Sequence, residues 1–155
     1  MARDEQLSSL DEFLALSTMT LSTASPDGKP HAAPVYFAAL SLINASPAPV
    51  FYFFSDPRSQ HGQQLDVNPR AAAAIYPPCF DWQDIRGVQM GGLAAPVGAG
   101  EEWNTAWELY KAKFHFVAGM KAIVARNLLY AFTPAWIRLV DNRRGFGFKQ
   151  EWRFP

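Results

Sequence analysis

The stretch FYFFSDPRSQHGQQLDVNPRAAAAIY, residues 51–76, decides the fold more than any other part of this chain. Its first residues belong to Val50–Phe54, a run of β-branched and aromatic side chains that predicts a core strand. Arg58–Val67 predicts a short helix, which Asn68-Pro69 ends, and Arg70–Tyr76 predicts the next strand. The order is therefore strand, polar turn, helix, strand.

The turn between the first strand and the helix has the residues of an anion site. Asp56 or Ser59 can cap the helix, and Pro57 suits its first position. Unpaired backbone amides, the positive end of the helix dipole and the guanidinium of Arg58 would together attract a phosphate. The same order of elements is also common without a ligand, in which case Arg58 is a solvated surface charge.

Working outward, the rest of the chain predicts more strands, with helices near their ends. Thr18–Ala24 alternates in polarity and forms an opening hairpin with Pro30–Leu40. Ile85–Val97 predicts a longer strand, and residues 98–119 change to the period of an amphipathic helix. Six strands in largely antiparallel order predict an α+β, mainly β chain with a curled or closed sheet. We expect residues 1–155 to form a single domain.

Composition excludes several classes of protein. The 155 residues are 49% hydrophobic and only 18% charged, with 14 basic and 14 acidic residues, so no nucleic-acid footprint or basic membrane patch is visible. Sparse surface charge favours a dimer. The acidic start lacks the features of a signal peptide, which predicts a cytoplasmic protein. Cys79 is the only cysteine and the histidines lack a ligand spacing, so no metal is expected.

Three segments in order resemble the pyridoxamine 5′-phosphate oxidase-like, FMN-binding split-barrel superfamily. They are PHAAPVYF (30–37), the opening stretch (51–76) and IRGVQMGG (85–92). The C-terminal DNRRGFGFKQEWRF (141–154) is similar to the closing strands of a small bacterial branch. The resemblance implies a six-stranded antiparallel split β-barrel with rim helices, a homodimer, and two FMN molecules in clefts between the subunits.

The resemblance also implies a set of FMN contacts, carried over by position. Residues facing the phosphate would be Ser55, Arg58, Ser59, Gln60 and His61. Residues near the ribityl chain or the ring would be Phe53, Phe54, Val35, Tyr36 and Gln89, with Trp152 closing the cleft from the other subunit. No catalytic residue is assigned, and His31 is interpreted as structural.

At the phosphate site the chain departs from the family pattern. Many relatives have Ser-Arg-Lys where this chain has Ser59-Gln60-His61. Two fixed cations are thereby replaced by a neutral amide and an imidazole close to neutrality at pH 7. Because each lost charge-assisted contact costs about 1.5–3 kcal/mol, we expect weaker FMN binding than in a relative with both cations.

Three functional hypotheses follow. The first is an FMN-dependent oxidoreductase acting on an unknown small molecule, because the flavin itself supplies the redox chemistry. Pyridoxamine phosphate oxidation is disfavoured, since the Arg-x-His motif of the vitamin-forming oxidases is not found near the C-terminus. The second is a non-catalytic flavin- or haem-binding split barrel for storage, sensing or delivery. The third is a cofactor-free dimeric module. FMN and a related deazaflavin remain alternatives.

Overall fold

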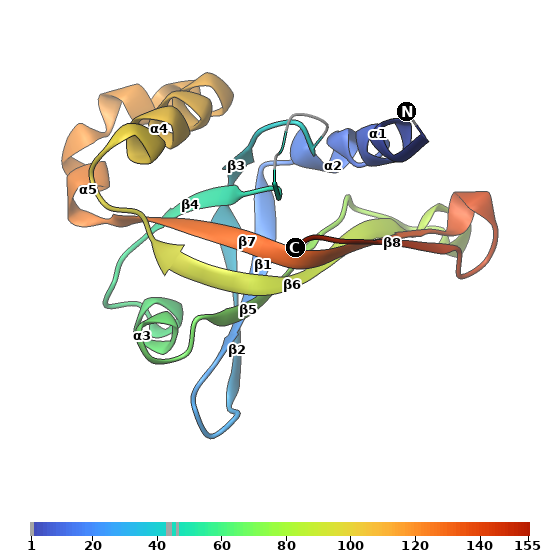
Figure 1. Ribbon diagram of the computed structural model, residues 1–155, viewed down its shortest axis with the longest axis horizontal. Helices are drawn as coiled ribbons and strands as arrows, with labels where there is room; N and C mark the ends of the chain where they lie inside the picture. Colours follow the sequence, from blue (N-terminus) through green and yellow to red (C-terminus); the bar gives the residue numbers. More distant parts are fainter. Residues whose placement is uncertain (1, 43–44, 46) are drawn as a thin grey trace.

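The computed structural model describes residues 2–42, 45 and 47–155. A curled, eight-stranded antiparallel sheet dominates the structure (Figure 1), in the order β2-β1-β5-β6-β7-β4-β3, with β8 paired to β7. The strands are β1 (Thr18–Ala24), β2 (Pro30–Tyr36), β3 (Ala38–Ala39), β4 (Phe51–Ser55), β5 (Arg70–Ile75), β6 (Arg86–Pro96), β7 (Leu128–Asp141) and β8 (Lys149–Arg153). The antiparallel, curled α+β architecture is as predicted.

The expected count of six strands is wrong, and the predicted strand Pro30–Leu40 shows one reason. It divides at Phe37, which is fully buried, into β2 and β3. The Phe37 amide still donates to the carbonyl oxygen of Ser17 at 3.2 Å, but the next residues pair with β4 instead of β1. The chain therefore passes from one part of the curled sheet to the other at this residue.

The helices lie around the sheet. They are α1 (Ala2–Ser8), α2 (Asp11–Leu14), α3 (Gln60–Val67), α4 (Glu101–Lys113) and α5 (Lys121–Arg126), with the 3₁₀ turns η2 (Trp82–Asp84), η3 (His115–Gly119) and η4 (Asn142–Arg144). Figure 1 shows α1 and α2 together, α4 and α5 together elsewhere, and α3 apart from both pairs. Among the described residues, no helix is long and apolar enough to cross a membrane.

Two predicted helices have different bounds. The helix expected over Arg58–Val67 begins at Gln60, because Ser59 has the extended backbone of an N-cap and leaves Pro57 outside the helix. The helical segment expected over residues 98–119 forms α4 and then η3. Phe114, between them, leaves the helical conformation at φ −120° and ψ 80°.

The core lies on the inner face of the curled sheet. Alternate residues of β1, such as Met19 and Leu21, point into it and are at most 1% exposed. Leu7 and Leu10 close it from the N-terminal helices, as their apolar spacing indicates. Three aromatic residues of α4 pack instead against Phe54 on the outer side of β4, namely Trp103, Trp107 and Tyr110. Helix α3 packs against β1 and β2 and adds Leu65 to the core.

Candidate functional site

Strand alternation separates the predicted contacts of β4. The Phe53 side chain is fully buried and stacks on Tyr130 in the core, with ring centroids 5.1 Å apart. Phe54 points to the opposite side and meets Tyr110 of α4 edge-on at 5.0 Å. Ser55 follows at the strand end on the same side as Phe53. The Phe53 side chain is therefore closed to a cofactor, whereas Ser55 faces α3.

Ser59 forms the N-cap of α3. Its hydroxyl donates to the Asp56 carbonyl oxygen at 2.6 Å and accepts from the Gly62 amide at 3.2 Å. The amides of Gln60 and His61 precede the first intrahelical hydrogen bond and have no partner within the helix. These two donors and the positive end of the helix dipole are the anion-attracting features of the turn.

Gly62 allows the turn to pack tightly on the first turn of α3. A Cβ atom at this position would lie 2.9 Å from the carbonyl oxygens of both Asp56 and Pro57. Any other residue would push these carbonyls away. The conformation of the turn therefore depends on the absence of a side chain at position 62.

Arg58 is the only lysine or arginine in residues 51–67. Its Nη2 lies 3.0 Å from Oδ2 of Asp56, and its backbone amide donates to Oδ1 at 2.8 Å. The same hydrogen bonds hold the pKa of Asp56 below its ordinary value. The side chain is 87% exposed, so the predicted phosphate-facing cation is a surface group paired with the neighbouring carboxylate.

His61 is the buried polar residue of the turn. It is only 8% exposed, and its Nε2 is hydrogen-bonded to the Ser55 hydroxyl. Its ring stacks on that of His31 from β2, with centroids 6.1 Å apart and an interplanar angle of 9°. Burial, and then the neighbouring His31, lower the pKa of His61 below its ordinary value of 6.5, so the imidazole is neutral at pH 7.

The structure adds residues that the sequence-based assignment did not include. His31 pairs in register with Thr23 of β1, and the Thr23 hydroxyl donates to Oε1 of Gln64 at 2.6 Å. The signal was present in the alternation of β2, because His31 and Val35 are four residues apart and so share a face. We call His31, Ser55, Ser59, Gln60 and His61 the α3 cluster.

The predicted ring contacts of β2 lie on opposite faces of the strand. Val35 is 7% exposed and belongs to the core. Tyr36 is half exposed and packs edge-on against Phe114 at 5.1 Å. The hydroxyl of Tyr110 donates to the Tyr36 carbonyl oxygen at 3.5 Å, and Tyr110 also contacts Phe54. Tyr36 and Phe54 are thus joined through α4, separately from the α3 cluster.

Gln89 and Trp152 do not join the α3 cluster within one subunit. Gln89 is exposed on the outer face of β6 and accepts from Nη1 of Arg138 at 3.5 Å. Trp152 is 6% exposed and belongs to the core of its own chain. Its side chain is therefore closed to a cofactor, while that of Gln89 remains open on the outer face of the sheet.

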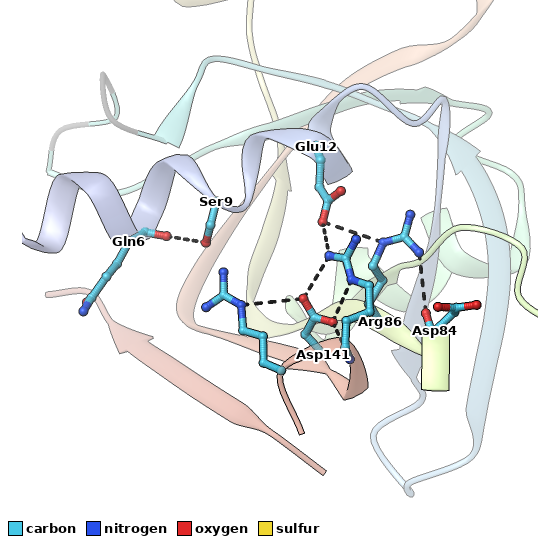
Figure 2. Close-up of polar contacts among 8 residues, drawn as sticks. Gln6, Ser9, Glu12, Asp84, Arg86 and Asp141 are labelled. Atoms are coloured by element: carbon cyan, nitrogen blue, oxygen red, sulfur yellow. Dashed lines mark hydrogen bonds and ion pairs between the residues drawn. The ribbon is translucent and has the colours of Figure 1, made fainter. Parts of the chain in front are cut away.

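A second polar cluster lies away from α3, where the ends of β6 and β7 meet α2. Figure 2 shows Glu12 facing Arg86 and the group around Asp141. Glu12 lies 3.7 Å from Nε of Arg86 and 3.0 Å from Nη2 of Arg143. Arg143 also pairs with Oδ2 of Asp141 at 2.9 Å. Because two carboxylates already neutralise Arg143, this cluster is a structural tie between elements.

Comparison with known proteins places the chain in a family. The family model described as pyridoxamine 5′-phosphate oxidase matches residues 8–141, most of the chain. The chain therefore belongs to this family.

Full-length similarity extends to the UPF0306 protein plu4501 of Photorhabdus laumondii, which is 26% identical over 99% of both chains. The pyridoxine/pyridoxamine 5′-phosphate oxidase of Bradyrhizobium sp. is 36% identical over 82 residues, which are 52% of this chain and 33% of the oxidase. The aligned part thus spans about a third of that oxidase.

Solved structures share the fold at lower identity. A haem-binding protein from Mycobacterium smegmatis superposes with a TM-score of 0.72 at 22% identity. The superposition covers 97% of this chain and 57% of the mycobacterial one. At this identity the similarity establishes the split-barrel fold alone.

Proposed function

We propose that the protein is an FMN-binding flavoprotein and an FMN-dependent oxidoreductase that acts on a small molecule. The observation that carries this proposal is the α3 cluster. It gathers two backbone amides without intrahelical partners, two serine hydroxyls and two stacked histidines around one helix start, in a chain that belongs to a flavin-associated oxidase family. Oxidation of pyridoxamine phosphate itself stays disfavoured.

The α3 cluster fits a terminal phosphate group. The amides of Gln60 and His61 are free of intrahelical partners, and the helix dipole adds roughly half a positive charge at this end. Ser55 supplies a hydroxyl beside His61. The absence of a Cβ at Gly62 keeps the turn compact. Arg58, the one fixed cation of residues 51–67, is already paired with Asp56, so the fit is to a weakly held anion.

The rest of the flavin would lie against surfaces that the described residues leave open. Tyr36 is the exposed aromatic residue among the predicted ring contacts, and Phe54 is partly open beside it. Gln89 is exposed on the outer face of the sheet, and in the proposed homodimer it would contact a flavin held by the second subunit. The side chains of Phe53, Val35 and Trp152 cannot contact the flavin, because all three are buried in the core.

The bound flavin supplies the redox step, and the chain supplies binding and orientation. The α3 cluster would hold the phosphate with neutral donors. Half-buried aromatic side chains would exclude water from one side of the ring. An imidazole that is neutral at pH 7 can accept a proton at this site but does not carry a fixed charge.

The direct test is the visible spectrum of the purified protein, followed by titration with FMN and with riboflavin. We expect FMN to bind at least tenfold more tightly than riboflavin, because only FMN can use the α3 cluster. Arg58→Ala should weaken FMN binding about two- to fivefold without affecting riboflavin. Arg126→Ala, an exposed arginine on α5, is the matched control. A colourless protein that binds neither FMN nor riboflavin would contradict the proposal and favour a cofactor-free dimeric module.

The second candidate is a split-barrel protein that binds haem without catalysis. It is favoured by the superposition on the mycobacterial haem-binding protein. Titration with haemin separates the two candidates, because a stoichiometric Soret band with no flavin binding would support haem. His61 is buried and hydrogen-bonded to Ser55. The His61→Gln variant therefore tests whether this residue contributes to binding of FMN or of haem.

A further inference from the structure

We propose that phosphate binding at the α3 cluster is coupled to the uptake of one proton by the His31–His61 pair. This inference rests on the proposed function, because its ligand is the phosphate monoester dianion of FMN. It adds that the charge which holds the phosphate is created on binding and is not present beforehand.

The geometry of the pair is the first argument. The two imidazole rings stack 6.1 Å apart and nearly parallel, one from β2 and one from α3. His61 is almost fully buried, with Ser55 at its Nε2. Two imidazolium ions so close would repel each other, and burial disfavours even one. Without a ligand, His61 is therefore neutral at pH 7.

The surrounding charges are the second argument. Residues 51–67 contain two carboxylates, Asp56 and Asp66, and one fixed cation, Arg58, which is paired with Asp56. Both carboxylates raise the pKa of the buried Tyr130 phenol beneath α3, after the larger effect of burial. β1 has no ionisable side chain, and Arg86, the one ionisable residue of β6, pairs with Glu12.

A phosphate dianion entering this site therefore meets no unpaired fixed cation among the described residues of these elements. Its charge favours the imidazolium form of a neighbouring histidine, so the pKa of that histidine rises. A solvent proton adds to one ring nitrogen, no covalent bond in the ligand changes, and the second ring stays neutral.

The consequence is that FMN affinity depends on pH. The FMN phosphate has its second pKa near 6, so above pH 7 it is already a dianion and contributes little further pH dependence. If one proton is bound with the ligand, Kd rises toward tenfold per pH unit between pH 7 and 8.5. Riboflavin lacks the phosphate, so its Kd should stay constant over the same range.

The experiment is titration of the full chain with FMN and riboflavin at several pH values and constant ionic strength. Calorimetry at pH 7.5 in two buffers of different ionisation enthalpy then counts the protons taken up, with about one expected per FMN. This count uses the unmodified protein, so it does not depend on whether a variant folds.

Three variants test whether His61 is responsible for the pH dependence of FMN binding. His61→Gln should weaken FMN at pH 7 and flatten the pH dependence, and His61→Lys should retain binding with a flat profile because its cation is fixed. His115→Gln, an exposed histidine on η3, is the matched control and should keep the wild-type slope. FMN binding with constant Kd and no proton uptake would overturn the coupling and leave the proposed function standing. No FMN binding at any pH would overturn both.

Discussion

Two basic side chains three residues apart, Arg58 and His61, end in opposite environments. Arg58 precedes the N-cap and points into solvent, where Asp56 holds it. His61 is the second residue of α3 and faces the barrel, where burial keeps it neutral. At the scale of single residues, the α3 cluster thus combines neutral donors with a neutral imidazole. If phosphate binds there, we expect the binding to be weak and pH-dependent.

The packing of the turn depends on Gly62. Replacing a helical glycine by alanine usually stabilises a protein by up to about 1 kcal/mol. Here we expect Gly62→Ala to destabilise the fold by about 1–3 kcal/mol, because its Cβ would lie 2.9 Å from two carbonyl oxygens. Chemical denaturation measures the change. Gly98→Ala, which meets nothing within 4 Å, is the control, and equal effects of the two would refute the packing argument.

At the scale of elements, the C-terminal end of α4 is fastened to the barrel by Lys113. Its Nζ donates to the carbonyl oxygens of Leu14, Leu16 and Phe37 at 2.8, 2.6 and 2.9 Å. Burial lowers the pKa of Lys113 to about 8. These carbonyls lie at the end of the N-terminal helices and at the break between β2 and β3. One side chain therefore joins three segments.

We expect Lys113→Met to destabilise the protein by about 1–3 kcal/mol, because three carbonyl groups lose their donor. Thermal or denaturant unfolding gives the value. The control is Lys111→Met on the same helix, whose ammonium pairs with Glu108 near the surface and should matter by less than about 1 kcal/mol. The fastening role is wrong if the two variants are equally stable.

At the scale of the whole molecule, ion pairs join helix α2 to the start of β6 and to the turn after β7. Glu12 of α2 pairs with Arg86 at the start of β6 (Figure 2). It also pairs with Arg143, which follows β7. Asp141 is 2% exposed, and three nitrogens of Arg143 donate to it at 2.9–3.0 Å. The N-terminal helices are thereby held to the sheet at a distance from the α3 cluster.

This network predicts the acid sensitivity of the fold. The hydrogen bonds from Arg143 hold the pKa of Asp141 below its ordinary value of 3.8. The carboxylate therefore stabilises the protein fully above that value, and the stabilisation is lost as pH falls through the lower pKa of the folded state. Asp141→Asn should destabilise by about 1–3 kcal/mol at pH 7 and flatten the acid limb of a stability profile. Glu108→Gln, an exposed change, should leave the acid limb unaltered.

Prediction from sequence succeeded where the signal is local. The bounds of β1 agree with its alternating pattern, and the strands of the 51–76 stretch lie within a residue of their expected bounds. It failed at Phe37, because the break depends on which strand the chain meets next. It also missed the ion pair between Arg58 and Asp56. The guanidinium of Arg58 binds this neighbouring carboxylate instead of staying free for an anion at the start of α3.

The order of strand, capped turn, helix and strand was determined by the sequence itself, because propensity and capping act over a few neighbouring residues. The sequence also shows directly that positions 60 and 61 hold Gln and His and carry no fixed cation. Only the tertiary structure decided that His31 stacks on His61 and that Phe53 and Trp152 lie in the core. The curl of the sheet brings residues far apart in the chain together at one barrel end, and strand alternation then selects which side chains face each other there.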